Sequence, residues 1–133
     1  MRHVPLLVVA VALYALTAVL GLAAPGSVFL GIGLVSGATL TLSVAELIVL
    51  LGLVLLFLEI LKSTRTASAS AIDHALSMAL FALCLVLFLS VPAFGTGTFF
   101  LLLAMTAIDV VAGFTVTINA ARRDVGFDPR NEL

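Results

Sequence analysis

The sequence has very little charge. Of its 133 residues, 6 are Lys or Arg and 7 are Asp or Glu, so charged residues make up 10% of the chain. A soluble domain carries about a quarter charged residues, because they cover its surface. Together with a net charge of −1, this scarcity excludes an ordinary soluble enzyme, a disordered chain and a basic nucleic-acid-binding protein. Since 63% of the residues are hydrophobic, we predict an integral membrane protein with no nucleic-acid partner.

Residues that ligate metals are equally scarce. The single cysteine, Cys84, lies inside an apolar run, so the chain can form neither an internal disulfide nor a thiolate metal cage. The two histidines, His3 and His74, are far apart, and their spacing suits neither zinc nor haem. We therefore expect no metal and no cofactor.

Four apolar runs are long enough to cross a bilayer. The hydrocarbon core requires about 20 mostly apolar residues per helix, because each residue advances roughly 1.5 Å. Such spans must satisfy their own backbone hydrogen bonds, which favours helices. The runs cover about residues 4–24, 44–61, 71–90 and 99–121, and a short tail follows at 122–133. We predict an all-α integral membrane fold, a four-helix antiparallel transmembrane bundle with short loops.

Several of the predicted helices begin with capping residues. Ser43 precedes Glu46 by three residues, the spacing of a capping box, and Ser70 precedes Asp73 in the same way. Thr96 can cap the fourth helix. Helix starts are therefore better marked than helix ends.

The alternative for the first run is a cleaved signal peptide. Arg2 supplies a basic residue, and residues 21–23 form a passable small-x-small cleavage site. The apolar stretch of about 20 residues is longer than the 7–15 residues usual for such a segment. We therefore predict a retained helix.

The basic residues give an orientation. The connections at residues 25–42 and 91–98 contain no charge, so all Lys and Arg residues fall on one side of the four predicted spans. They are Arg2, Lys62, Arg65, Arg122, Arg123 and Arg130. By the positive-inside rule, we predict an inner-membrane protein with both termini in the cytoplasm.

The segment between the first two spans is apolar but rich in glycine. Its run of about 13 apolar residues is too short to cross a membrane. Apolar residues alternate with Gly or Thr, as in a β-strand, and Ser36-Gly37 can form a turn. Residues 27–42 therefore fit a short extracytoplasmic hairpin, and a re-entrant or interfacial helix is the alternative that remains open.

Asp109 lies near the midpoint of the fourth run. A carboxylate at that depth costs roughly 2.5–3.5 kcal/mol on insertion scales, so it must face protein or water. One interpretation is a proton or cation site. The other is a neutral, hydrogen-bonded acid that fixes helix packing, and the sequence leaves both open.

Tyr14 lies at the middle of the first run, the depth predicted for Asp109. We hypothesise that the Tyr14 hydroxyl donates a hydrogen bond to the Asp109 carboxyl, with Thr106 on the same helix face as part of the candidate site.

Small and hydroxyl-bearing residues continue these stripes on both helices, at steps of three or four residues. Such stripes let helices approach closely and form hydrogen bonds. The predicted helix-packing face comprises Ala10, Thr17, Gly21, Gly113 and Thr117.

The remaining polar residues of the predicted helices are interpreted as structural. Glu46 is the capping-box partner, and Glu59 reaches towards Lys62; at about 100° per residue, the two acids point in nearly opposite directions. Asp73 caps the third helix, with His74 at the membrane interface. We therefore expect no second buried charge at the depth of Asp109.

Two functional hypotheses follow. The first is a non-enzymatic accessory, assembly or interaction subunit of a membrane complex, because the extramembrane parts are small and no catalytic constellation is evident. The alternative is a small proton- or cation-linked transporter or channel that uses Asp109. Such a transporter requires a homo-oligomer, because four helices leave little room for an aqueous route. An enzyme ranks third, since no nucleophile or acid pair is brought together by spacing. The expected partners are lipid and either further copies of the chain or a larger membrane complex.

Overall fold

The computed structural model describes residues 4–22, 27–63 and 70–125. The described part is mostly helical and contains four α-helices. Three of these, α2, α3 and α4, are long and apolar enough to cross a membrane, whereas α1 is a shorter apolar helix. The elements are α1 (Leu7–Val19), β1 (Val28–Gly33), β2 (Thr39–Ser43), α2 (Val44–Ser63), α3 (Ser70–Ser90), the 3-10 turn η1 (Pro92–Phe94) and α4 (Gly97–Val125).

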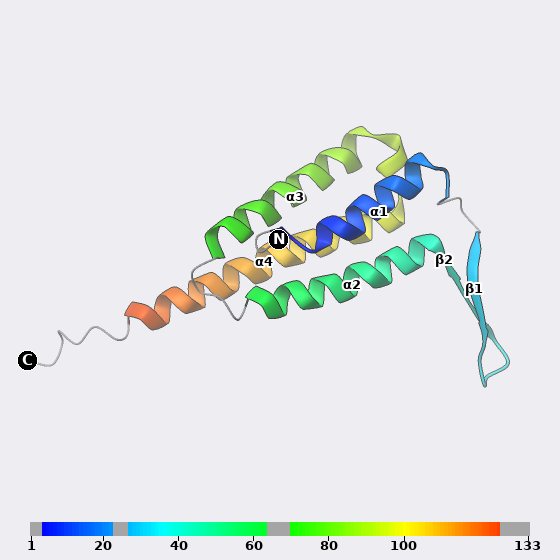
Figure 1. Cartoon of the computed structure of the whole chain (residues 1–133), viewed down its shortest axis with the longest axis horizontal. Helices are drawn as coiled ribbons and strands as arrows, with labels where there is room; N and C mark the ends of the chain where they lie inside the picture. The colour runs from blue at the N-terminus through cyan, green and yellow to red at the C-terminus, as the bar shows by residue number, and fades with distance from the viewer. Residues whose placement is uncertain (1–3, 23–26, 64–69, 126–133) are drawn as a thin grey trace, which may run out of the picture.

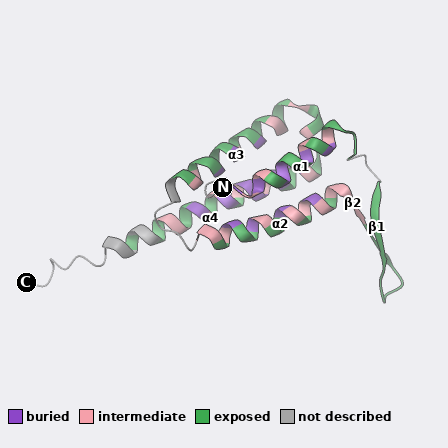
Figure 2. Cartoon of the chain, in the orientation of Figure 1, coloured by how far each residue is buried: buried purple, intermediate pink, exposed green. Residues whose placement is uncertain are grey.

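Helix α4 is the centre of the bundle. It packs against α1, α2 and α3, and α1 also packs against α2. Figure 1 shows α1 and α3 running in one direction and α2 and α4 in the other. Buried residues face the neighbouring helices, while the outer helix faces are exposed (Figure 2). These outer faces carry large apolar side chains such as Leu53, Phe57, Leu83 and Val86.

The core is closely packed. Its largest fully buried side chains include Leu7 of α1, Cys84 of α3, and Phe99 and Leu102 of α4. Gly52 of α2 lies where these helices meet. A Cβ atom there would be 3.0 Å from Met105 Sδ and 3.7 Å from Ala10 Cβ. This glycine therefore allows α1, α2 and α4 to approach closely, a role that the sequence analysis missed.

Helix α1 is shorter than the predicted span at residues 4–24. Its 13 residues extend roughly 20 Å, less than the 30 Å of a typical hydrocarbon core. Gly21, at φ 68°, ends the helix: the Leu22 N–H donates to Thr17 O at 2.9 Å and the Gly21 N–H to Ala18 O at 3.4 Å. This is a Schellman motif, which requires the left-handed conformation that glycine adopts easily.

The prediction that Gly21 belongs to the helix-packing face is therefore wrong. No atom lies within 4 Å of the position that a Cβ would occupy on this residue. Ala10 and Thr17, by contrast, are buried. The end of the predicted span, at residues 23–24, lies outside the described residues.

The segment between α1 and α2 is a β-hairpin. Strands β1 and β2 pair antiparallel, with Gly33 opposite Thr39 at the turn end. The turn uses Gly37 at φ 84°, whose N–H donates to Leu34 O at 3.0 Å. The prediction of a β-hairpin in this segment is confirmed, and the alternative of a helix there is wrong.

Two predicted caps are confirmed. The Ser43 N–H donates to Glu46 Oε2 at 2.7 Å and the Glu46 N–H to Ser43 Oγ at 3.3 Å, which completes the capping box of α2. The Phe99 N–H donates to Thr96 Oγ1 at 3.2 Å, so Thr96 caps α4. The side chain of Ser70, in the third predicted cap, lies outside the described part of the structure.

Candidate functional site

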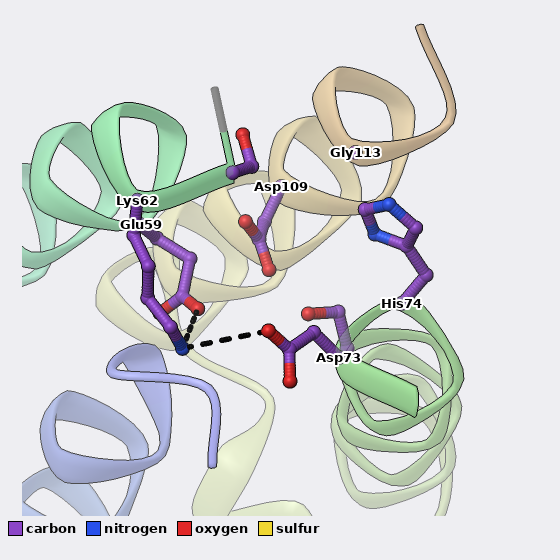
Figure 3. A pocket seen from close by; sticks show the side chains of 8 residues that line it. Glu59, Lys62, Asp73, His74, Asp109 and Gly113 are labelled. Carbon is purple, nitrogen blue, oxygen red and sulfur yellow. Dashed lines mark hydrogen bonds and ion pairs between the residues drawn. The ribbon is translucent and has the colours of Figure 1, made fainter. Parts of the chain in front are cut away.

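A polar pocket lies where α2 ends and α3 begins, beside the middle of α4. We call this the pocket end of the bundle and the opposite end, where the hairpin and η1 lie, the hairpin end. The pocket has an empty volume of about 270 Å³, which includes space open to solvent. Figure 3 shows it from close by. It is lined by Glu59, Lys62, Ser63, Asp73, His74, Ser77, Asp109 and Gly113.

Asp109 points into this pocket from α4 (Figure 3). The residue is only 6% exposed, and its carboxyl group is hydrogen-bonded to Ser77 of α3. The acid is thus satisfied by a hydroxyl group on a neighbouring helix and also lies at the edge of a cavity. A buried acid requires such a partner, because an unpaired polar group in an apolar interior is costly.

Glu59 of α2 is a second buried acid in the same pocket, at 7% exposure. Its Oε2 atom accepts a hydrogen bond from the Leu6 N–H at the start of α1, and its Oε1 atom lies 3.4 Å from Lys62 Nζ. The predicted Glu59–Lys62 pair is confirmed. The expectation that no second buried charge lies at the depth of Asp109 is wrong.

Lys62 also connects α2 to α3. Its Nζ atom lies 3.9 Å from Asp73 Oδ2, in addition to its contact with Glu59 (Figure 3). One ammonium group therefore lies between two carboxylates from different helices. Its positive charge offsets their mutual repulsion, which matters most where little water is present to screen it.

His74 packs against α4 at the rim of the pocket. Its Nε2 atom is 2.6 Å from Thr117 Oγ1, and its ring stacks on Phe114 at a centroid distance of 6.1 Å. A Cβ atom on Gly113 would overlap the imidazole ring. The predicted packing residues Gly113 and Thr117 thus contact His74 of α3, and His74 is half-buried between helices.

The predicted hydrogen bond between Tyr14 and Asp109 is wrong. The Tyr14 hydroxyl is hydrogen-bonded to Thr96 Oγ1, immediately before α4 begins. Along α4, the stretch from Gly97 to Asp109 is roughly 18 Å at 1.5 Å per residue, so Tyr14 and Asp109 belong to different ends of the bundle.

Thr106 is not among the pocket-lining residues. It is 1% exposed, and its hydroxyl donates to Leu103 O at 2.7 Å within α4. The structure therefore pairs Asp109 with Ser77 of α3 and not with Tyr14, and it leaves Thr106 outside the pocket.

The level of Asp109 along the bundle also differs from the prediction, which placed it near the midpoint of the predicted spans. Helix α4 has 29 residues and extends beyond the ends of α2 and α3 (Figure 1). The middle of α4 is therefore level with the last two turns of α2, which hold Glu59 and Lys62, and with the first turn of α3, which holds Asp73. Neither capping signals nor hydropathy reveal such an offset between helices. For this reason Glu59 and Asp73 were not predicted to lie close to Asp109.

The chemistry available in the pocket is proton exchange and electrostatic binding. Two buried carboxyl groups, a third carboxylate, an ammonium group and an imidazole lie around one cavity. In residues 4–22, 27–63 and 70–125, no group of three or more His, Cys, Asp or Glu side chains is arranged to hold a metal ion.

The chain was compared with protein-family models, with curated proteins and with solved structures, and no match was found in any of the three.

Proposed function

We propose that this chain is a small multi-pass membrane protein that acts as a non-enzymatic accessory, assembly or interaction subunit of a membrane complex. The supporting observation is the contrast between its interior and its surface. The interior between the helices is closed by tightly packed side chains, including Phe99, Leu102 and Thr106. The outward faces of all four helices carry exposed apolar side chains, which lipid or another membrane protein can cover.

The proposed location is the inner membrane, with both termini in the cytoplasm. Helices α2 and α4 both run from the hairpin end to the pocket end, so Lys62 and Arg122 lie towards the same side. The hairpin and η1, at the other end, contain no charged residue. This distribution follows the positive-inside rule.

The test of the accessory role is the composition of the particle that contains the chain. The protein is expressed from its native locus with a C-terminal tag, extracted in mild detergent or native nanodiscs, and weighed by native mass spectrometry. We expect a complex with other subunits in a fixed ratio. A single chain under every gentle condition would contradict the proposal.

A second candidate function is a proton- or cation-linked transporter or channel. The observation that favours it is the presence of two buried acids, Asp109 and Glu59, in one pocket together with Lys62, Asp73 and His74. Because the core of one chain is closed between this pocket and the hairpin end, a continuous route would have to run between several copies.

Flux measurements distinguish this second function. Proteoliposomes that contain wild type, Asp109→Asn or the matched control Glu46→Gln are given proton, sodium or potassium gradients. A transporter would show flux that Asp109→Asn reduces at least about tenfold, as loss of an essential exchanging acid implies, while Glu46→Gln retains it. Equal flux from wild type and Asp109→Asn, or no flux from either, would eliminate this function.

A further inference from the structure

The hairpin has two chemically different faces. On one face, Leu30 pairs with Leu42 and Ile32 pairs with Leu40. On the other face, Gly31 pairs with Thr41 and Gly33 pairs with Thr39. Because side chains alternate along a strand, this register gathers four aliphatic side chains on one side. The paired residues on the other side are glycine and threonine, and Phe29 falls at the register shift between Val28 and Leu30.

Most of the aliphatic face is exposed, and only Leu42, next to α2, is partly buried. Leu30, Ile32 and Leu40 are 43%, 45% and 42% exposed, even though they pair across the strands. Val35, at the turn, is fully exposed, and every residue of β1 is exposed. Figure 2 shows the hairpin projecting from the bundle, exposed along β1 and along β2 except where β2 meets α2. An exposed apolar face of this kind is typical of a surface that binds a membrane or another protein.

The hairpin also has a defined direction relative to the helices. Strand β2 ends at Ser43 and α2 begins at Val44, so the two are joined without a linker. Figure 1 shows the hairpin running across the direction of the helices and away from the bundle. If α2 crosses a bilayer, the hairpin therefore lies parallel to the membrane plane and outside the area covered by the helices.

We propose that the hairpin binds the outer surface of the lipid bilayer, with Leu30, Ile32, Leu40 and Leu42 facing the acyl chains and Thr39 and Thr41 facing water. This inference rests on the proposed membrane location. Residues 27–43 contain no charge that would oppose such burial. The unpaired backbone groups on the two strand edges require water or head groups, which keeps the hairpin at the interface and out of the hydrocarbon core.

A lipid surface explains the face segregation better than a second copy joined through the strand edges. Edge-to-edge pairing would satisfy backbone groups, but it would leave the aliphatic faces of both copies exposed. The exposed side of α2 includes Leu50, Leu53 and Phe57, with the exposed Glu46 one turn nearer the hairpin on the same face, and the helix joins β2 directly at Ser43. Lipid around α2 can therefore cover both surfaces.

Spin labels on adjacent residues test this orientation. Cys84 is replaced by Ala, and single cysteines at Ile32, Leu40, Thr39 or Thr41 are labelled with a nitroxide. The variants are reconstituted in vesicles of phosphatidylethanolamine and phosphatidylglycerol. At each site, the collision rate of the nitroxide with oxygen, which concentrates in lipid, is divided by its collision rate with a water-soluble nickel chelate. Phe57 on α2 and Arg122 on α4 supply the matched lipid and water controls.

We expect the oxygen-to-nickel ratio to be several-fold higher at both Ile32 and Leu40 than at both Thr39 and Thr41. Equal ratios on the two faces, with a high ratio at Phe57, would overturn the hairpin inference and leave the membrane location intact. A low oxygen-to-nickel ratio at Phe57 would overturn both the hairpin inference and the proposed membrane location. Dipolar broadening at Leu40 that disappears on dilution with unlabelled protein would identify a second copy as the occupant and also overturn the inference.

Discussion

The two ends of the bundle are held together by different interactions. At the pocket end, polar groups link the helices: Glu59 binds the Leu6 N–H, Asp109 binds Ser77, and His74 binds Thr117. At the hairpin end, three rings pack together, with centroids 5.2 Å apart for Tyr14 and Phe99, 4.8 Å for Phe94 and Phe99, and 6.0 Å for Tyr14 and Phe94.

This difference shows how a chain with few charged residues distributes its polar side chains between the two ends of the bundle. The aromatic cluster derives its stability from contact area and ring geometry, which are insensitive to pH. The hydrogen bonds at the pocket end are made by the carboxyl groups of two buried acids and by one imidazole ring. Among the described residues, the polar groups that link the helices are therefore concentrated at the pocket end with Lys62, whereas ring packing dominates the hairpin end.

The largest expected loss of stability comes from a substitution in the aromatic cluster of Tyr14, Phe94 and Phe99. Phe99→Ala should lower the free energy of unfolding by about 3 kcal/mol, because it leaves a cavity where a fully buried ring was. The neighbouring Phe100 is 53% exposed on the outer face and provides the control. Unfolding of both variants in mixed detergent micelles measures the difference. Equal losses from Phe99→Ala and Phe100→Ala would show that the cluster is not a packing centre.

At the pocket end, the sharpest steric test is Gly113→Ala. The added methyl group would overlap the His74 ring, so we expect a loss of about 1–3 kcal/mol in unfolding free energy. Since the clash is with one side chain, His74→Ala in the same chain should recover most of this loss. Gly97→Ala is the control, because nothing lies within 4 Å of its added Cβ. A double variant no more stable than Gly113→Ala would contradict the contact.

A smaller effect is expected for the hydrogen bond between Tyr14 and Thr96. Tyr14→Phe should cost about 1 kcal/mol. Thr96→Ala also removes the cap of α4 and should cost at least as much. Because the two side chains share one bond, Tyr14→Phe should cost almost nothing more in a Thr96→Ala background. A double-mutant cycle in detergent measures this coupling, and strictly additive losses would show that the bond contributes no stability.

The smallest effect is expected for Lys62→Met at the pocket rim. Lys62 is partly exposed and its contacts with Glu59 and Asp73 are long, at 3.4 and 3.9 Å. We expect a loss below about 1 kcal/mol that decreases further in high salt. Unfolding at two salt concentrations checks this. A loss as large as that of Phe99→Ala would mean that the ion pairs, and not the aromatic cluster, dominate the stability of the bundle.

The sequence predicted the elements of this fold well where local chemistry decides them. The Ser43–Glu46 box and the Thr96 cap mark the starts of α2 and α4 because they satisfy backbone donors within the same few residues. The hairpin was predictable from its period of two and from Gly37. The end of α1 at Gly21 was missed because a glycine on a helical stripe can serve either close packing or a left-handed cap.

The pocket was only partly predictable. Asp109 could be selected because an acid in an apolar run needs a partner, but its partner depends on how far α4 is displaced along α3. That displacement is set by side-chain packing, for example by Gly52 against Met105 and by Gly113 against His74. The periodicity of a single helix contains no information on it, and for this reason Ser77 and Glu59 were not assigned to the site.

The most direct test is whether the two ends of the bundle lie on opposite sides of a membrane. Single cysteines at Val35, in the hairpin turn, and at Arg122, on α4, can be placed in a Cys84→Ala background and treated with a membrane-impermeant maleimide. Labelling is compared in spheroplasts and in inverted inner-membrane vesicles. Because α2, α3 and α4 separate these two positions, the account predicts that Val35→Cys is labelled only in spheroplasts and Arg122→Cys only in inverted vesicles. Labelling of both cysteines from the same side would contradict it.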